Sequence, residues 1–449
     1  MKIVTAHQMQ KIDEETIRKH GVSRLELMEN AGRAVVEVLG SVRDLKVLIL
    51  AGKGNNAGDG FVVARLLSQA GGAVQVCLTT DEKEFKEETA KNYQRLKNLP
   101  LSIFSYSKKE FLKRVSQVDL VIDALFGTGI HSNLNSYYCE LIRTLNKKNL
   151  PVLSIDIPSG VHGDTGKMMG EAIQATWTVT FGLPKLGLLV PPGIDSVGKL
   201  EVRNIGFPEK LLNSASSLEY LQKEDVQRGL PKRSKSAHKG TFGHALIVAG
   251  SPGKIGAAVM ATQAAFRSGV GLVTLLTHPK SLKLIAPQVK EAFLESFVTH
   301  EKDYKKYIQN KKAIAIGPGI GFYEEARNLL NWTLKYSKVP VIVDADGLTI
   351  LANVIPDPRM TSPLILTPHP GEMARLIGKS IQAVQKDRIH IAKSFAQKYS
   401  CYLVLKGAGT VIATPDGKVT INSTGNPAMA TAGMGDVLTG MIASFIAQG

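Results

Sequence analysis

The chain has 449 residues, of which 44% are hydrophobic and 21% charged, and its formal net charge is +16. This length predicts two domains of roughly 200 residues each, and the composition excludes wholesale disorder. The basic charge could attract anionic ligands, nucleic acid or membranes. Lysines and arginines are scattered, however, and no zinc-finger or RNA-recognition motif occurs, so no nucleic-acid module is expected.

The cysteines and the N-terminus indicate a cellular location. Cys77, Cys139 and Cys401 are far apart and form no C-x-x-C pair, which is typical of a reducing compartment. Residues 1–20 carry charges where a secretory signal needs an apolar stretch, and no run of about 18 apolar residues follows. We therefore expect a cytoplasmic protein that does not span a membrane.

The first half reads as a parallel α/β sheet. An amphipathic helix is expected over 24–40, followed by short apolar runs that alternate with glycine-rich loops and helical periodicity. The runs are "VLILAG", "AVQVCLTT", "VDLVIDALFGTG", "PVLSIDIPSG" and "ATWTVTFG". In open α/β sheets ligands bind outside the carboxyl ends of the strands, where Asp123 and Asp156 are expected.

A polar segment over 212–240 predicts a linker with one short helix, so we expect domains over 1–215 and 222–449. A second α/β series follows, with the runs "HALIVAG", "GLVTLLT", "AIAIGPGIG", "VPVIVDADG", "PLILTPHPGE" and "YLVLKGAGTVIATPDGKVTI". Its Pro-Asp-Gly at 415–417, between β-branched residues, predicts a hairpin turn.

The loop "GKGNNAGDG" follows the first run and could bind a dinucleotide. Gly52, Gly54 and Ala57 satisfy G-x-G-x-x-G/A, and Asp81 lies where a ribose-binding acid is expected, so a Rossmann oxidoreductase is a competing interpretation. The loop is long for that fold. A lone fingerprint of this kind is a weak signal.

The polar residues of this loop have local explanations. Asn55 and Asn56 could form turns, and Asp59 could cap a helix that begins at Phe61. Their convergence with other loops favours a ligand. Asn56, Asp123 and Ser159 come from three loops at one sheet edge and offer only oxygens, which suits a hard cation. Asp156 then remains for proton transfer or sugar binding.

Four motifs in order, "GKGNNAGDGFVVARLL", "DALFGTGI", "DIPSGVHGDTG" and "TVTFGLPKLG", resemble the YjeF N-terminal domains, which are NAD(P)HX epimerases that bind potassium. The resemblance implies a Rossmann-like three-layer αβα domain, catalysis by Asp156 and K⁺ on Asn56, Asp123 and Ser159. It implies substrate binding by Asn55, Asn56, Ala57, Gly58, Asp59, Gly127, Thr128, Gly129, Ile130, His131, Ser132, Asn133 and Asp156.

One position departs from this family's pattern. The family reads N-N-G-G-D-G, so Ala57 replaces a glycine, and its methyl group could narrow the approach of a phosphate to the backbone. YjeF-like domains also occur as non-catalytic interaction modules. Asp123, Asp156 and the intact Gly-Thr-Gly at 127–129 favour the enzyme, because proton transfer requires acidic groups.

The second half holds candidates for phosphoryl transfer without a P-loop, since Val161 stands where that motif needs its first glycine. Gly433, Gly435 and Asp436 open an apolar helix whose amides could bind an anion. Asp436 could only cap this helix, or could act as a general base. Lys406 could be solvated or could neutralise phosphates, and His369, between two prolines, could be structural or could hold substrate.

The order of "HKGTFGHALIVAGSPGKIGAAVMATQAAFRSGVGLV", "AIGPGIG", "VIVDADGL", "LTPHPGEMARL", "LVLKGAGT" and "AGMGDVLTG" is similar to the ribokinase-like NAD(P)HX dehydratases. This resemblance implies a second αβα domain with catalysis by Asp436. It implies substrate contacts from Ala257, Gly319, His369 and Asp436, and adenine-nucleotide contacts from Lys406, Gly407, Ala408, Gly409, Thr410 and Gly435.

Together the resemblances imply a homo-oligomeric enzyme that repairs hydrated NADH and NADPH. One domain would interconvert the R and S epimers. The other would use ADP or ATP with Mg²⁺ to phosphorylate the C6 hydroxyl of the S form and eliminate phosphate. The alternative is a ribokinase-like vitamin-precursor or sugar kinase joined to a non-catalytic YjeF-like domain. Because the chain stops 13 residues after Asp436, where family members continue, a truncated sequence is expected.

Overall fold

The computed structural model describes residues 1–41, 43–353 and 362–449. These described residues divide into two compact units, Met1–Tyr220 and Leu221–Gly449, and each is considered by itself. The segment 212–240 contains the short helix α8 (Lys223–Gly229), as predicted, and also the strand β8 (Leu218–Tyr220), which the sequence did not predict. None of the described helices is both long and apolar enough to cross a membrane.

The first unit contains a parallel sheet in the strand order β3-β2-β1-β4-β5-β6-β7. Its strands are β1 (Lys46–Ala51), β2 (Ala73–Leu78), β3 (Ser102–Ser105), β4 (Leu120–Ala124), β5 (Val152–Ile155), β6 (Trp177–Phe181) and β7 (Lys199–Arg203). The chain adds β2 and β3 on one side of β1, and then returns to add β4 to β7 on the other side, so the direction in which strands are added changes between β1 and β4. The loops after these strands therefore diverge and leave a crevice at their carboxyl ends.

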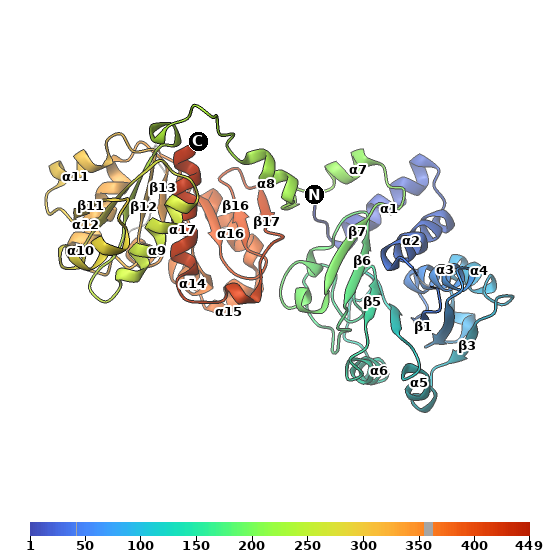
Figure 1. The fold of residues 1–449 in the computed structure, drawn as a ribbon. Coiled ribbons are helices and arrows are strands. Elements are labelled where there is room, and N and C mark those ends of the chain that lie inside the picture. Colours follow the sequence, from blue (N-terminus) through green and yellow to red (C-terminus); the bar gives the residue numbers. More distant parts are fainter. Residues whose placement is uncertain (42, 354–361) are drawn as a thin grey trace. The chain divides into compact units, whose positions relative to one another are not determined.

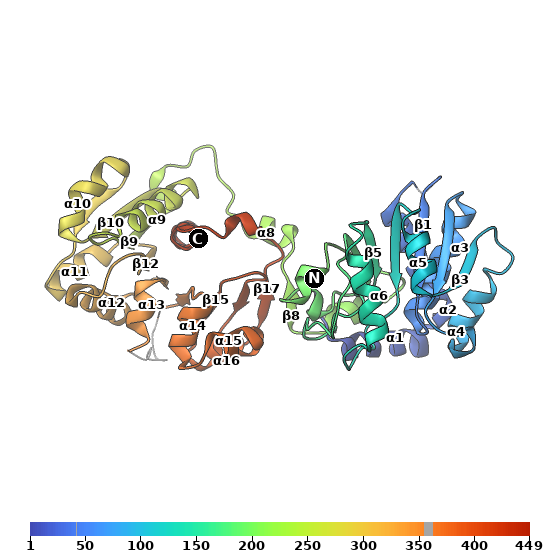
Figure 2. The same cartoon turned by 90° about the horizontal axis from the view of Figure 1, so that it is seen from below.

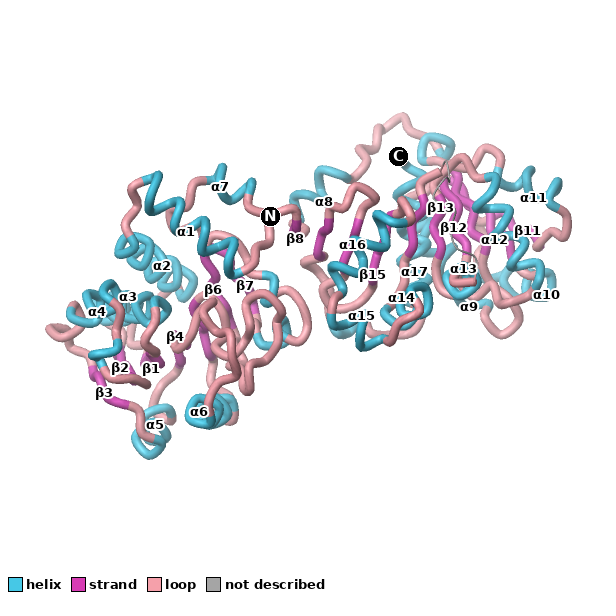
Figure 3. The backbone as a smooth tube through the Cα atoms, turned by 180° about the vertical axis from the view of Figure 1, so that it is seen from behind, coloured by secondary structure: helices cyan, strands magenta, loops and turns pink. Residues whose placement is uncertain are grey.

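Helices cover both faces of this sheet (Figures 1 and 3), which explains why its central strands are continuously apolar. Residues from α3 and β1, including Phe61, Val63 and Ile49, form one buried cluster, and residues around Phe111 and Leu141 form the other. The helices are α1 (Ala6–His20), α2 (Arg24–Leu39), α3 (Asn55–Gln69), α4 (Glu87–Gln94), α5 (Lys108–Val115), α6 (Ser136–Asn146) and α7 (Glu209–Ser214).

The second unit contains a mixed sheet in which the strands run β11-β10-β9-β12-β13-β14-β15-β16-β17. They are β9 (His244–Val248), β10 (Leu272–Thr277), β11 (Phe293–Ser296), β12 (Ala313–Ile316), β13 (Val341–Val343), β14 (Leu364–Leu366), β15 (Tyr402–Leu405), β16 (Val411–Ala413) and β17 (Val419–Ile421). The last two pair antiparallel across the predicted Pro-Asp-Gly turn, so the hairpin is confirmed.

Helices lie on both sides of this sheet as well (Figure 2), with α9 and α17 packed together on one side. The helices are α9 (Ile255–Arg267), α10 (Pro279–Ile285), α11 (Glu301–Ile308), α12 (Glu324–Tyr336), α13 (Asp346–Leu351), α14 (Pro370–Ile377), α15 (Ile381–Lys386), α16 (Arg388–Lys398) and α17 (Met434–Gln448). Both units are thus three-layer αβα domains, as the sequence predicts.

Candidate active sites

A cleft of about 630 Å³ lies at the carboxyl ends of the first sheet. Its lining includes the predicted substrate residues Asn55, Asn56, Asp59, Gly127, Thr128, Gly129, Ile130 and Asp156. Among the described residues, the other predicted contacts do not line it, namely Ala57, Gly58, His131, Ser132 and Asn133. The methyl group of Ala57 packs in the hydrophobic core, so it does not narrow the cleft.

The opening loop is shorter than the sequence suggested because α3 begins at Asn55. Asp59 therefore lies inside the helix, and the interpretation of Asp59 as the cap of a helix beginning at Phe61 is wrong. Asn55 and Asn56 form the first helical turn. The N-cap is Gly54, which has no side chain to cap the helix, so the amides of Asn55 and Asn56 remain available to a ligand, whereas the amide of Ala57 already donates to the carbonyl of Gly54 at 3.1 Å.

Two loops of this cleft touch through a glycine. A Cβ atom at Gly52 would lie 2.1 Å from the carbonyl oxygen of Leu125, so no larger residue fits there without movement. Gly52 follows β1 and Leu125 follows β4. This close approach fixes the loops on either side of the crevice.

The predicted cation ligands form one bonded group. Ser159 donates to Asp123 through its Oγ at 2.6 Å and its backbone nitrogen at 2.8 Å, and Ser154 Oγ also donates to Asp123 at 2.8 Å. Asn56 Nδ2 donates to the carbonyl of Phe126 at 2.9 Å, and the amide of Phe126 donates to Ser159 Oγ at the same distance. The structure thus brings Asn56, Asp123 and Ser159 together.

One oxygen of this group has no partner. Asn56 Oδ1 is buried and forms no hydrogen bond to any described residue. A buried amide oxygen is normally satisfied by a protein group, a water molecule or an ion, so this atom is a candidate ligand. Asp123 is fully buried and its two oxygens already accept hydrogen bonds, so a cation bound directly to Asp123 would replace some of them. The all-oxygen group fits a hard cation.

Asp156 is held by a lysine that the sequence analysis did not single out. Lys185 Nζ is 2.6 Å from Asp156 Oδ1 and also donates to Thr180 Oγ1 and the carbonyl of Phe181. Only 2% of Lys185 is exposed. Asp156 itself adopts a left-handed backbone with φ of 66°, and its amide bonds to Val179. The sequence signal that could have pointed to this ion pair is the presence of a lysine inside the apolar motif "TVTFGLPKLG".

Three further carboxyl groups line the cleft, on Asp13, Glu14 and Asp59. Burial raises the pKa of Asp13 to about 6, and nearby Asp156 adds to the rise while Lys185 opposes it. Burial likewise raises the pKa of Asp59, again with a contribution from Asp156. Asp13 lies on α1, whose sequence reads as an ordinary surface helix. No sequence signal pointed to Asp13.

In the second unit, the N-terminus of α17 has no side-chain cap, as at helix ends that bind anions. Its N-cap is Gly433, with φ of 87°, and its first turn contains Gly435 and Asp436. Asp436 is therefore not the cap, and that interpretation is wrong. Burial raises the pKa of Asp436 to about 6, Asp344 adds to the rise, and Lys406 reduces it. This pKa suits a general base near neutral pH.

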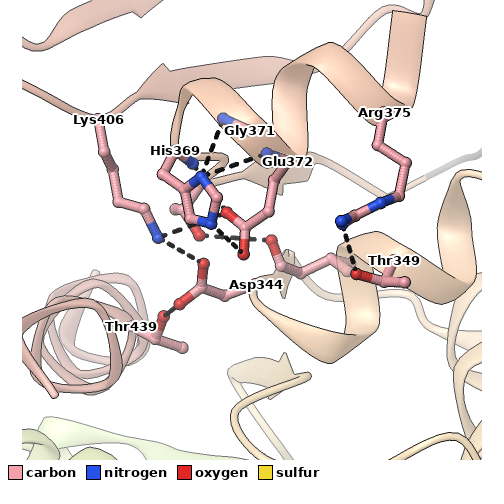
Figure 4. A network of polar contacts seen from close by, with 10 residues as sticks. Asp344, Thr349, His369, Gly371, Glu372, Arg375, Lys406 and Thr439 are labelled. Carbon is pink, nitrogen blue, oxygen red and sulfur yellow. Dashed lines mark hydrogen bonds and ion pairs between the residues drawn. The ribbon is translucent and has the colours of Figure 1, made fainter. Parts of the chain in front are cut away.

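A polar network lies beside this helix end (Figure 4). Lys406 Nζ is 2.8 Å from Asp344 Oδ1 and 3.9 Å from Glu372 Oε2, while Thr439 donates to Asp344 at 2.7 Å. A Cβ atom at Gly435 would lie 3.3 Å from Lys406 Nζ, so the backbone of α17 passes directly along the lysine. Lys406 is thus an ion-paired residue of the site. Asp344 is 1% exposed and was not predicted.

His369 caps the helix α14. Its Nδ1 accepts hydrogen bonds from the amides of Gly371 and Glu372, and its own amide donates to Glu372 Oε2 at 2.8 Å (Figure 4). The ring therefore carries its proton on Nε2 when neutral. More than half of the His369 side chain is exposed, and its Nε2 lies 3.5 Å from Glu372 Oε1, so a ligand at this edge of the ring would share Nε2 with that carboxylate.

Ala257 and Gly319 lie next to each other. A Cβ atom at Gly319, where φ is 58°, would lie 3.1 Å from Ala257 Cβ. Lys254, just before α9, pairs with Asp346 at 2.7 Å, and the field of Asp346 also acts on Asp436. The predicted contacts of the second unit therefore gather at the carboxyl ends of its strands.

A buried arginine supports the glycine loop over 406–410. Arg388 Nη2 donates to the carbonyls of Leu405 at 3.0 Å and Lys406 at 3.3 Å, and reaches that of Gly409 at 3.5 Å. Arg388 is 6% exposed, and burial lowers its pKa. Gly407 lies against it, because a Cβ atom there would be 2.6 Å from Arg388 Nη1. Arg388 was also missed, since nothing distinguishes it from a surface arginine in the sequence.

Comparison with known proteins identifies the family of each unit. Residues 24–187 match the YjeF-related protein N-terminus and residues 245–449 match the NAD(P)H-hydrate dehydratase family. Bifunctional NAD(P)H-hydrate repair enzymes Nnr from Moorella thermoacetica and Thermofilum pendens are each 40% identical to the chain. Each alignment covers 100% of this chain and 88% of the relative.

A crystal structure of the ADP/ATP-dependent NAD(P)H-hydrate dehydratase from Bacillus subtilis, co-crystallized with ATP/Mg²⁺, is 38% identical, with a TM-score of 0.46. The alignment covers 51% of this chain and 81% of the Bacillus subtilis chain. The two family matches define a two-domain α/β enzyme of the YjeF and dehydratase class. The chain belongs to the bifunctional NAD(P)H-hydrate repair enzymes.

Proposed function

We propose that this chain repairs hydrated NADH and NADPH at two sites. Residues 1–215 would interconvert the R and S epimers, and residues 222–449 would use ADP or ATP to dehydrate the S form. Family membership along the whole chain supports the pair of activities. A repair enzyme needs both activities, because a site that aligns the C6 oxygen of one epimer with a phosphoryl group cannot also align the C6 oxygen of the other epimer.

The observation that carries the dehydratase assignment is Asp436, a base with a pKa of about 6 in the first turn of a glycine-capped helix. Asp436 takes the proton of the C6 hydroxyl, and the hydroxyl oxygen attacks the terminal phosphorus of the nucleotide. The leaving group is ADP when ATP is the donor and AMP when ADP is the donor. The electron pair of the ring nitrogen then expels phosphate, and loss of a C5 proton restores the dihydronicotinamide. The amides of α17 and Lys406 stabilise the phosphoryl charge.

Mg²⁺ would enter this site with the nucleotide and neutralise phosphate charge. Among the described residues, no group of His, Cys, Asp and Glu side chains is arranged to hold a metal by itself. This agrees with a site in which the nucleotide's own phosphates supply ligands. Ala257, Gly319 and His369 would hold the hydrated nicotinamide, and the loop 406–410 with Gly435 would hold the nucleotide.

The test is to mix the purified chain with both epimers of NADHX, K⁺, Mg²⁺ and either ADP or ATP, and to follow the returning dihydronicotinamide absorbance. Complete recovery with one nucleotide is expected and identifies the donor. A stable phosphate ester in place of inorganic phosphate would instead indicate the kinase alternative. No reaction with either nucleotide would contradict the dehydratase assignment.

For the first site we propose that K⁺ binds at Asn56, Asp123 and Ser159. The buried, unpartnered Asn56 Oδ1 supports this assignment. The ion would tie together the loops after β1, β4 and β5 and offset negative charge of the substrate phosphates. In K⁺, but not in Li⁺ at equal ionic strength, we expect a higher melting temperature of the first unit. Asn56→Ala should remove this difference, and an equal effect of both ions would contradict the site.

We also propose a self-associating, cytoplasmic protein. Cys77, Cys139 and Cys401 are free thiols, which suits a reducing compartment. Sedimentation velocity tests the self-association, because a single boundary at the mass of one chain, 48.5 kDa, would contradict it.

A further inference from the structure

The first cleft contains a carboxyl group that none of the four N-terminal motifs includes. Asp13 lies on α1, ahead of residues 24–187, which match the YjeF family. Its side chain nevertheless lines the same cleft as Asn56, Gly127 and Asp156. Asp13 is only partly exposed, and its carboxyl group forms no hydrogen bond or ion pair with any described residue. A group of this kind in a cleft is free to exchange a proton with a ligand.

Lys53 and Lys86 also line the cleft, but the charged groups that act on Asp13 come from five other positions. They are Glu14 on α1, Arg24 on α2, Asp59 on α3, Asp156 after β5 and Lys185 after β6. Burial is the largest influence and raises the pKa of Asp13 to about 6, with Asp156 adding to the rise and Lys185 and Arg24 opposing it. Near neutral pH, part of the population therefore carries a proton on Asp13.

Asp156, unlike Asp13, has hydrogen-bond partners on one of its oxygens. Lys185 and Thr180 both donate to its Oδ1, at 2.6 and 3.0 Å. Its Oδ2 faces the Gly127 loop, since a Cβ atom at Gly127 would lie 3.7 Å from it. No described residue donates to this second oxygen. In this cleft Asp156 is paired with an ammonium, whereas Asp13 and Asp59 are desolvated. One paired and one desolvated carboxyl group are typical of an assigned base and an assigned acid, and Asp13 is the desolvated group that lies outside the four motifs.

We propose that Asp13 is a second proton-transfer residue of the epimerase site, acting on the substrate opposite Asp156. This inference rests on the proposed epimerase function of the first unit. Its chemical reason is that C6 of the substrate bears both a hydroxyl group and the ring nitrogen N1, so inversion by ring opening moves two protons. One leaves oxygen and one arrives at nitrogen.

In the forward step Asp156 removes the hydroxyl proton, and the electron pair of the O–H bond forms the C6=O double bond. The C6–N1 bond breaks, its electron pair remains on N1, and Asp13 donates a proton there. Rotation about C5–C6 turns the other face of the aldehyde toward the nitrogen. Asp13 then removes the N1 proton as N1 attacks C6, and Asp156 returns its proton to oxygen. Atoms and charges balance, and no oxidant or reductant is needed.

The test compares the full chain with its Asp13→Asn and Asp13→Glu variants, starting from R-NADHX in the presence of K⁺ without nucleotide and separating the epimers by chromatography. Asp13→Asn should lower kcat of epimerisation by about 100-fold or more with little change in KM. Asp13→Glu should keep part of the rate. The wild-type rate should fall on the alkaline side of the pH profile as Asp13 loses its proton, and Asp13→Asn should lack this limb.

The matched control is Glu15→Gln, which removes an acid on the same helix that pairs with exposed Lys19. It should epimerise like the wild type. Near-ultraviolet circular dichroism checks that each variant is folded. A wild-type kcat in Asp13→Asn, or a raised KM with the alkaline limb intact, would overturn the proposal. If the wild type has no epimerase activity, both the proposed function and this inference are contradicted. If the wild type is active and the Asp13 variants have the same activity, only the role of Asp13 is contradicted.

Discussion

The pKa of Asp436 links catalysis to pH in the second unit. Because burial raises it to about 6, the base is protonated and inactive at lower pH. We expect kcat/KM of dehydration to fall as the pH decreases below about 6. Asp436→Asn should lower the rate by about 100-fold or more at every pH. Initial rates with S-NADHX and saturating nucleotide measure both effects.

The same residue should reduce stability at neutral pH. A carboxyl group whose pKa is raised by folding binds its proton more tightly in the folded state, so stability is lost as the pH rises between 3.8 and about 6. Asp436→Asn should therefore melt at a higher temperature than the wild type above pH 6, and this advantage should vanish below pH 4. A difference in melting temperature that is equal at all pH values would show that burial does not raise the pKa of Asp436.

The pair of Lys185 and Asp156 is expected to matter for folding as well as for chemistry. Replacing Lys185 with Met leaves Asp156 without its ammonium partner, and breaking one side of a buried pair costs about 3 to 5 kcal/mol. Urea denaturation of the full chain, followed through the transition of the first unit, measures this loss. Epimerisation should also fail.

The double variant Lys185→Met with Asp156→Asn should recover part of the lost stability, because no unpaired charge remains. Lys199→Met is a matched control, since it breaks an exposed pair with Glu201 in the same sheet and should cost about 1 kcal/mol or less. Equal losses for Lys185→Met and Lys199→Met would contradict the role assigned to the buried pair.

Among the structural elements, the glycine loop over 406–410 depends on Arg388. Nη2 of Arg388 donates to carbonyls at both ends of the loop, so Arg388→Met should displace the nucleotide contacts. We expect KM for the nucleotide to rise roughly tenfold or more while KM for S-NADHX changes little, since small displacements carry large costs at such sites. Arg388→Lys should recover little, because a single ammonium nitrogen cannot keep both the Nη2 bonds to the loop and the Nη1 bond to Gln385. Lys398→Met, exposed on the same helix, is the control; equal nucleotide KM values for Arg388→Met and the wild type would contradict the role.

The elements themselves were largely predictable. Apolar runs with glycine-rich ends predicted the parallel strands, because strands buried on both faces show no alternation. The boundary of α3 was missed because Asn55 and Asn56, which favour turns, begin the helix instead. Side chains recruited by tertiary contact were also missed. Lys185, Asp344 and Arg388 acquire partners far away in sequence, so spacing alone could not mark them.

At the scale of the whole molecule, two sites on one chain predict a division of labour that single substitutions can separate. Asp156→Asn should abolish epimerisation but leave dehydration of S-NADHX intact, so recovery from an epimeric mixture should stop at the S fraction apart from the slow spontaneous conversion. Asp436→Asn should do the reverse, exchanging the epimers without restoring NADH.

Mixing these two variants provides the decisive measurement. If each site releases its product to solution, the mixture should restore both epimers completely, since one protein supplies S-NADHX and the other consumes it. The rate should then rise with the concentration of the Asp436→Asn protein. Full epimerisation by Asp156→Asn alone would contradict the assignment of Asp156, and a mixture that still stops at the S fraction would show that the two activities require one intact chain.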